Sequence, residues 1–97
     1  MKPDKKRRLK IQDFIWDYLL INPCRDCGES DLLVLEFDHR DPSLKSFNIS
    51  DAPQKRLGLK RVLEEINKCD VVCANCHRKR TAFKYHDRKV QKASKQP

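Results

Sequence analysis

Two Cys-x-x-Cys pairs are the part of this sequence whose residue types and spacing point most directly to chemistry. The pairs are Cys24 with Cys27 and Cys73 with Cys76, and residues 28–72 separate them. Each pair puts two sulfurs on one tight turn, and four thiolates bind Zn²⁺ tetrahedrally at about 2.3 Å per sulfur. The spacing therefore predicts a structural zinc ion that ties together two distant parts of the chain. Cys69, the fifth cysteine, belongs to neither pair.

Disulfide bonds and a redox dithiol both fit the paired cysteines less well than zinc does. Disulfides are typical of secreted chains, and no secretory signal precedes the first pair. A redox dithiol would be expected in a β-α-β pattern, and neither pair lies in one. No stretch is long and apolar enough to cross a membrane. We therefore expect a cytoplasmic zinc protein with no membrane partner, encoded by a host genome, a phage or a mobile element.

Asp38, His39 and His77 form a second group with chemical potential. Asp38 offers a hard oxygen ligand and His77 an imidazole, a combination suited to Mg²⁺, Mn²⁺ or another divalent ion. Imidazole titrates near neutral pH, which suits His39 to act as a general base. An isolated Asp-His pair is more often a surface turn. The zinc, however, would bring these residues together, because Cys27 leads into one strand and Cys76 adjoins His77.

Hydrolysis of a phosphodiester needs groups of this kind. A base must activate water, and a cation must hold the phosphate and stabilise the leaving oxygen. On an ideal strand Asp38 and His39 point to opposite faces. A shared site therefore requires the strand to bend or end there, and the sequence Arg40-Asp41-Pro42 is consistent with an ending.

Hydrophobic periodicity predicts an α+β protein in which helices flank a β-hairpin. We expect helices over 4–20, 57–68 and 75–89, strands over 32–39 and 70–73, and a short extended piece over 47–49. The second strand would pair back on residues 33–38. Residues 1–21 would form a basic N-terminal helix, residues 22–90 the main domain, and residues 91–97 a disordered basic tail.

Charge is unevenly distributed along the chain, whose formal net charge is +8. Residues 2–10 and 78–95 are strongly basic, whereas residues 22–51 hold seven acids and three bases. Charge runs alone also fit solvated surface. Basic ends around an acidic middle nevertheless favour phosphate binding outside and a cation-dependent site inside. The candidate DNA-contacting residues are Lys5, Lys6, Arg7, Arg8, Arg78, Lys79, Arg80 and Lys84.

Three segments together resemble the HNH endonucleases, the ββα-metal nuclease family. The segments are Pro23-Cys24-Arg25-Asp26-Cys27-Gly28-Glu29, Leu35-Glu36-Phe37-Asp38-His39-Arg40-Asp41-Pro42 and Cys69-Asp70-Val71-Val72-Cys73-Ala74-Asn75-Cys76-His77-Arg78-Lys79-Arg80-Thr81. The resemblance implies a small ββα-metal (HNH) domain with zinc knuckles and flanking helices, in which a hairpin and a helix hold one catalytic divalent ion. By that similarity His39 matches the general base, and Asp38 and His77 match the ligands of the catalytic ion.

The middle asparagine of the HNH pattern has no direct counterpart in this chain. Where many members carry it, a few residues before Cys73, this sequence reads Lys68-Cys69-Asp70. Asn67, Asn75 or Asp70 could orient the base instead. We select Asn75, because it lies inside the second knuckle, beside the expected site.

The resemblance implies a metal-dependent endonuclease or nickase that acts on DNA, foremost double-stranded DNA. A chain of 97 residues offers little surface for reading a long site, so we also expect a protein partner that supplies specificity. The alternative is a zinc-knuckle nucleic-acid-binding module without catalysis, since zinc and basic flanks suffice for phosphate contacts. The nuclease is favoured because a pure binder has no need of Asp38, His39 and His77 together.

Overall fold

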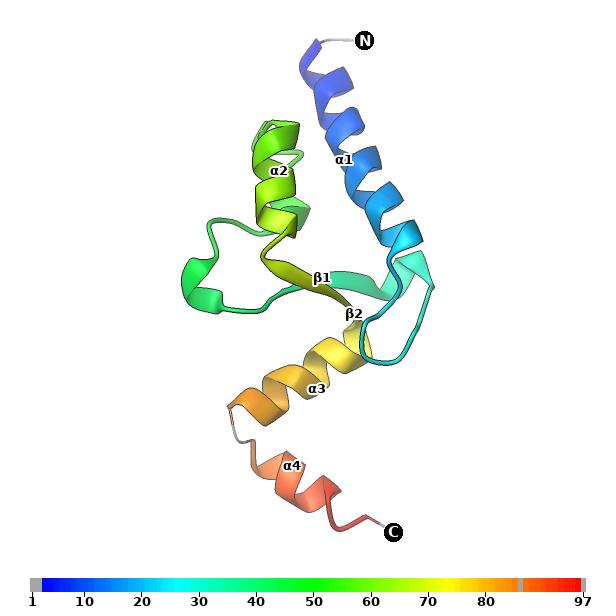
Figure 1. The fold of residues 1–97 in the computed structure, drawn as a ribbon, viewed down its shortest axis with the longest axis vertical. Helices are drawn as coiled ribbons and strands as arrows, with labels where there is room; N and C mark the ends of the chain where they lie inside the picture. The colour runs from blue at the N-terminus through cyan, green and yellow to red at the C-terminus, as the bar shows by residue number, and fades with distance from the viewer. Residues whose placement is uncertain (1–2, 86, 97) are drawn as a thin grey trace.

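The α+β fold expected from the sequence is confirmed in the computed structural model, which describes residues 3–85 and 87–96. The helices and strands follow the order α1 (Pro3–Ile21), β1 (Leu35–His39), α2 (Leu59–Ile66), β2 (Cys69–Cys73), α3 (Ala74–Lys84) and α4 (Arg88–Ala93). The hairpin of β1 and β2 lies at the centre, with α1 and α2 on one side and α3 and α4 on the other (Figure 1). Among the described helices, none is long and apolar enough to cross a membrane.

The two strands pair antiparallel, with Leu35 opposite Cys73 and His39 opposite Cys69. Side chains alternate along β1, so that Phe37 and His39 share one face and Asp38 faces the other way. Phe37 packs against Tyr18 of α1, with ring centroids 5.9 Å apart. The hairpin therefore presents one face to α1 and α2, and its opposite face to α3.

The first strand begins later than the sequence predicted. Residues Leu32–Val34 form a 3₁₀ turn, and the Asp31 carboxylate accepts a hydrogen bond from the Leu33 amide at 2.9 Å. This side-chain acceptor satisfies the amide locally, which favours the turn over an extended strand. The extended piece expected over 47–49 is no strand: Asn48 is extended, but a 3₁₀ turn begins at the next residue and covers Ile49–Asp51.

The main core lies between α1, α2 and the loop that joins β1 to α2. Apolar residues spaced four apart on each helix face each other there, as the helical spacing predicted. Burying one such aliphatic side chain contributes about 1.5–3 kcal/mol. The buried members are Ile11, Ile15, Phe47, Ile49, Ala52, Val62 and Ile66. A second cluster surrounds the cysteines and consists of Leu19, Cys24, Leu35, Val71, Val72, Cys73 and Cys76.

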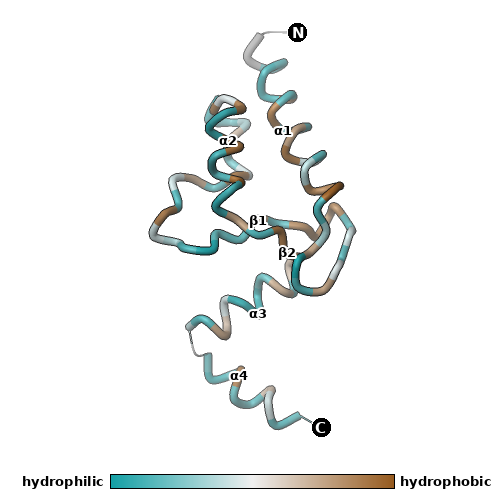
Figure 2. The backbone as a smooth tube through the Cα atoms, viewed as in Figure 1, coloured by the Kyte–Doolittle hydropathy of each residue, from teal (hydrophilic) through white to brown (hydrophobic). Residues whose placement is uncertain are grey.

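The C-terminal region differs from the single helix expected over 75–89. Helix α3 ends at Lys84, and α4 begins at Arg88 because the Asp87 carboxylate caps it, accepting a hydrogen bond from the Lys89 amide at 2.8 Å. The tail expected to be disordered from residue 91 is helical to Ala93, while residue 97 lies outside the described residues. Helix α4 has no buried residue and is mostly hydrophilic (Figure 2).

Candidate metal centre and catalytic groups

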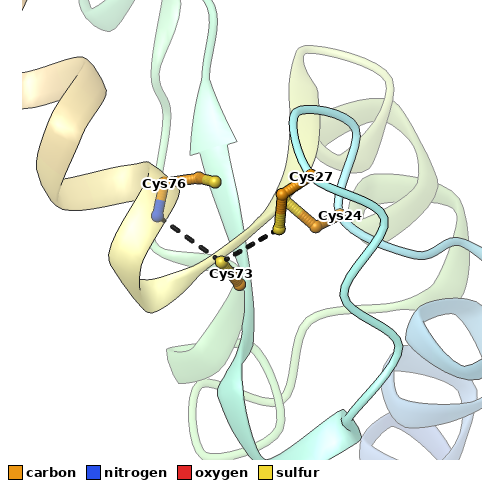
Figure 3. Close-up of side chains that lie close together, drawn as sticks. All are labelled: Cys24, Cys27, Cys73 and Cys76. Carbon is orange, nitrogen blue, oxygen red and sulfur yellow. Dashed lines mark hydrogen bonds between the residues drawn. The ribbon is translucent and has the colours of Figure 1, made fainter.

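The four paired cysteines meet at one point, as their spacing predicted (Figure 3). Cys24 and Cys27 come from the loop after α1, Cys73 ends β2, and Cys76 lies in the first turn of α3. Their sulfur atoms all lie within 4.8 Å of one another, and those of Cys27 and Cys73 are 3.7 Å apart. Four sulfurs each about 2.3 Å from a tetrahedral Zn²⁺ would be about 3.8 Å apart. The donor set therefore fits a metal ion such as zinc.

Backbone hydrogen bonds shape the first knuckle and attach it to the sheet. The Gly28 amide donates to the Cys24 carbonyl at 2.9 Å, and Gly28 adopts φ +83°, a left-handed conformation that glycine tolerates best. The Arg25 amide donates to the Val71 carbonyl of β2 at 2.8 Å. This bond holds the Cys24–Cys27 turn beside β2, and so beside Cys73.

The environment of the sulfurs already favours thiolate at one position. Burial raises the pKa of Cys24, but hydrogen bonds from the backbone amides of Cys73, Cys27 and Asp26 outweigh burial and lower its pKa to about 6. Burial raises the pKa of Cys76 to about 12. Metal binding requires deprotonated cysteines, so a cation here would have to displace a proton from Cys76. Cys69 lies outside the cluster, and burial raises its pKa to about 12.

Asp38 and His77 are brought together by the hairpin and α3. His77 Nδ1 lies 2.7 Å from Glu36 Oε1, so Nδ1–H donates a hydrogen bond to the Glu36 carboxylate, and in the neutral imidazole Nε2 is then the acceptor nitrogen. That Nε2 lies 3.4 Å from Asp38 Oδ1. Two lone-pair atoms thus face each other, which a proton on Nε2 or a shared cation would stabilise. Ligands about 2.1 Å from one ion lie about 3.0–3.4 Å apart, so the pair fits a small divalent cation.

His39 lies on the other face of β1 and contacts a buried carboxylate. Its Nε2 is 2.7 Å from Glu65 Oε2, and only 8% of the His39 side chain is exposed. Burial raises the pKa of Glu65, but hydrogen bonds from Lys68, the Ser46 amide and His39 outweigh burial and lower it to about 2. Glu65 is therefore ionised at neutral pH and can only accept hydrogen bonds.

Strand β1 ends at His39, directly before Arg40-Asp41-Pro42, as the sequence predicted, but this ending does not turn His39 towards Asp38. His39 is still a regular partner of Cys69, so Asp38 and His39 keep opposite faces. Both residues nevertheless line a single depression of about 840 Å³, together with His77. The three residues selected from the sequence therefore border one space, in which Asp38 pairs with His77 and His39 pairs with Glu65.

Arg80, which the charge run assigned to DNA contact, binds three carboxylates of its own chain. Its Nε and Nη2 donate to the two oxygens of Asp26 at 2.6 and 2.7 Å, and its Nη1 donates to Asp38 and Asp70, each at 3.0 Å. The hydrogen bonds to Asp26 are the main reason that the pKa of Arg80 is raised. Arg80 is therefore paired within the protein, and its contact with DNA stays a prediction.

Asp26 and Asp70 belong to this network, a role that the sequence did not indicate for either of them. The Arg80 guanidinium holds the pKa of Asp26 below its usual range. Burial raises the pKa of Asp70, but Arg80 and Arg40 outweigh burial and lower it. Asp70 also pairs with Arg25 at 3.1 Å. Both acids are therefore ionised at neutral pH. Both accept hydrogen bonds from the Arg80 guanidinium, which also donates to Asp38.

The remaining basic candidates divide between the two ends of the molecule. Arg78, Lys79 and Lys84 are exposed on α3, and Lys84 lines the depression. Lys5, Lys6, Arg7 and Arg8 are exposed on the first turns of α1, on the other side of the hairpin from α3 in a molecule 56 Å long (Figure 1). The two clusters therefore do not form one continuous surface. Lys45, which lies outside both basic runs of the sequence, also lines the depression.

Asn75, selected as the residue that orients the base, is exposed on the first turn of α3. Within the described part of the chain, the hydrogen-bond partner of His39 is Glu65. The Asn67 carbonyl accepts a hydrogen bond from Arg40, and Asp70 binds Arg80. None of the three candidates for the middle role therefore reaches His39, and the structure gives that contact to a residue of α2.

Comparison with models of known protein families, with curated proteins and with solved structures gave no match. Function must therefore be inferred from the chain's own residues and their geometry.

Proposed function

We propose that this protein is a metal-dependent DNA endonuclease or nickase of the HNH type. The observation that carries the proposal is the facing pair of Asp38 Oδ1 and His77 Nε2, 3.4 Å apart, in a depression that His39 also lines. The order of β1, β2 and α3, with the four-cysteine cluster at the junction of β2 and α3, supports a ββα-metal domain. In that domain the cluster would hold a structural zinc ion.

The chain's own groups are arranged for hydrolysis of a phosphodiester. Glu36 fixes the tautomer of His77, so that Nε2 and Asp38 Oδ1 can both bind a cation. A divalent cation bound there, such as Mg²⁺ or Mn²⁺, would act as a Lewis acid on the scissile phosphate and the leaving oxygen. His39 would take the proton from the attacking water. Lys45 and Lys84, which line the same depression, would hold neighbouring phosphates of double-stranded DNA.

The second candidate is a zinc-containing nucleic-acid-binding module without catalysis. One observation favours it: Asp38 is already paired with Arg80 at 3.0 Å and His77 with Glu36 at 2.7 Å, so both have partners within the protein. Under this alternative, His77 carries a proton on Nε2 and the site needs no second cation. The two candidates differ in whether divalent ions other than zinc change what the protein does to DNA.

The deciding experiment is cleavage of supercoiled plasmid by zinc-loaded protein with Mg²⁺, Mn²⁺ or Ni²⁺. We expect nicking that His39→Ala reduces on the order of 10²- to 10⁴-fold, the usual contribution of a positioned acid–base group. Asp38→Ala and His77→Ala should instead raise the divalent-ion concentration needed for half-maximal rate. Asp17→Ala, a change of an exposed acid on α1, is the matched control and should behave like the parent.

Zinc content and DNA affinity are measured on the same samples, and both should stay unchanged in the His39 variant. If the parent protein fails to nick plasmid with every divalent ion tested, the nuclease is refuted and the binding module remains. Equal activity of the parent and all three site variants would also refute the nuclease, because the nicking would then come from a contaminant.

A further inference from the structure

Glu65 is a buried carboxylate that the proposed function does not yet use. It lies on α2, 2% of its side chain is exposed, and it accepts three hydrogen bonds. His39 Nε2 lies 2.7 Å from Oε2, the Ser46 amide 2.9 Å from the same oxygen, and Lys68 Nζ 2.8 Å from Oε1. A buried ionised group is costly unless it is paired and hydrogen-bonded in this way. Such an environment favours a specific use for the carboxylate.

We propose that Glu65 is the positioning residue of the general base: it fixes the His39 imidazole in the tautomer that carries its proton on Nε2, leaving Nδ1 to accept a proton. This inference rests on the proposed nuclease function, to which it adds the residue that fills the middle role. Glu65 itself touches neither DNA nor water at the reacting centre in this scheme, so it acts only through His39.

The chemistry of the contact gives the tautomer. An ionised carboxylate has no proton to donate, so the atom that faces it at 2.7 Å must be the donor, and Nε2 is that atom. Neutral imidazole has one donor and one acceptor nitrogen, which makes Nδ1 the acceptor. Lys68 and the Ser46 amide keep Glu65 ionised, since both hydrogen bonds favour the charged form. A carboxylate also stabilises the imidazolium that forms after proton uptake.

A purely structural role for Glu65 must be separated from this one. Glu65 accepts the Ser46 amide, and its partner Lys68 also donates to the Leu44 carbonyl at 3.0 Å, so the pair fastens the loop after β1. A change to alanine would remove the acceptor of the Ser46 amide and one acceptor of Lys68, and would disturb this loop. Glu65→Gln keeps the size and one acceptor oxygen, but its NH₂ group can donate to Nε2 and thereby favour the opposite tautomer.

The test compares zinc-loaded parent, Glu65→Gln and Glu64→Gln. Glu64 is the exposed neighbour on the same helix and gives a control with the same change in charge. The first readout is the ¹⁵N spectrum of the His39 imidazole without DNA, which distinguishes a proton on Nε2 from one on Nδ1. We expect the Nε2–H tautomer in the parent and in Glu64→Gln, and a gain of the Nδ1–H tautomer in Glu65→Gln.

The second readout is the maximal nicking rate at saturating divalent ion. Glu65→Gln should lower that rate on the order of 10²-fold or more, as expected when a base is held in the wrong tautomer. The divalent-ion concentration for half-maximal rate should not change, because Glu65 is not a ligand. If Glu65→Gln only loosened the loop after β1, the maximal rate and the half-maximal ion concentration would change together or not at all. The tautomer of His39 would then stay unchanged.

The outcomes separate this inference from the function beneath it. A parent spectrum that shows the Nδ1–H tautomer overturns the role of Glu65, even where Glu65→Gln fails to fold. A parent that nicks DNA together with a Glu65→Gln variant that nicks equally well also overturns it, while the nuclease stands. A parent with no nicking activity overturns the nuclease and, with it, any catalytic role for Glu65.

Discussion

Replacing Arg80 with alanine should lower the stability of the protein and leave the salt dependence of DNA binding unchanged, which is the reverse of what the basic run Arg78-Lys79-Arg80 suggests. The Arg80 guanidinium is already bound to Asp26, Asp38 and Asp70. Hydrogen bonds between charged groups that are partly buried contribute about 1 kcal/mol each after allowance for solvent. Loss of the contacts to Asp38 and Asp70, 22% and 10% exposed, should therefore lower the free energy of unfolding by about 2 kcal/mol.

In a domain of this size that loss corresponds to a fall in Tm of about 10 °C. It should be measured by thermal unfolding at a fixed free zinc concentration, because any bound ion shifts the apparent stability. DNA binding should be measured as the slope of log affinity against log salt. Affinity itself falls when Arg80 is removed, since the site becomes more negative, so the slope is the deciding quantity.

Arg78→Ala is the matched control, because Arg78 is exposed on the same helix. It should leave the stability within about 0.5 kcal/mol and reduce the salt slope by about 0.9 if Arg78 contacts one phosphate. Arg80→Ala should leave the slope as in the parent. A lower slope in Arg80→Ala with unchanged Tm would refute the reasoning, since the guanidinium would then be contacting phosphate and not its own carboxylates.

Two further predictions concern zinc and the N-terminal cluster. One Zn²⁺ per chain should survive dialysis. Cys24→Ser or Cys73→Ser should lose zinc and unfold much of the domain, because metal affinity contributes to folding free energy. Cys69→Ser should keep the zinc and the fold, as measured by metal analysis and circular dichroism. Removing residues 1–10 should lower the salt slope of DNA binding by about 0.9 for each phosphate released, whereas an unchanged slope would mean that this cluster is only solvated surface.

The cysteine cluster and the meeting of Asp38 with His77 could be predicted because both follow from short spacings. Cys76 and His77 are adjacent, and Cys27 leads through a short turn into β1, the strand of Asp38. Bringing the four cysteines together therefore also brings Asp38 close to His77. Helices α1 and α2 were also predictable, since their apolar spacing has the helical period. Predicting these features requires only local sequence patterns and the metal-binding chemistry of the cysteine thiolate.

The contacts of Glu65 and Arg80 could not be predicted from charge alone, because sequence reasoning assigns charged side chains to solvent. A signal was nevertheless present in α2. Glu65 lies between Val62 and Ile66 on the helix face that is buried, whereas Glu64 is exposed. A carboxylate on an apolar face requires a buried partner. The spacing could have indicated that a partner exists, but only the fold shows that it is His39.

Helix α3 carried a similar signal. Arg80 follows His77 by three residues and Lys84 follows Arg80 by four, and residues at those spacings share a face. All three line the depression. By charge alone the stretch from 78 to 84 is one basic run, although its members at 78 and 79 face elsewhere and remain exposed. Helical phase, more than charge, separates the residues that line the depression from those that stay exposed on α3.

The same network explains how a chain with so small a core can hold Asp38 and His77 in place. Asp26 lies between the two cysteines of the first knuckle, and its carboxylate binds Arg80, which in turn binds Asp38. The second knuckle ends β2 and begins α3, and His77 follows it directly. Any shift of the cysteine cluster must therefore move His77 through the backbone and Asp38 through Arg80. Metal binding at the cysteines would stabilise the hairpin and, through these two routes, set the distance between Asp38 and His77.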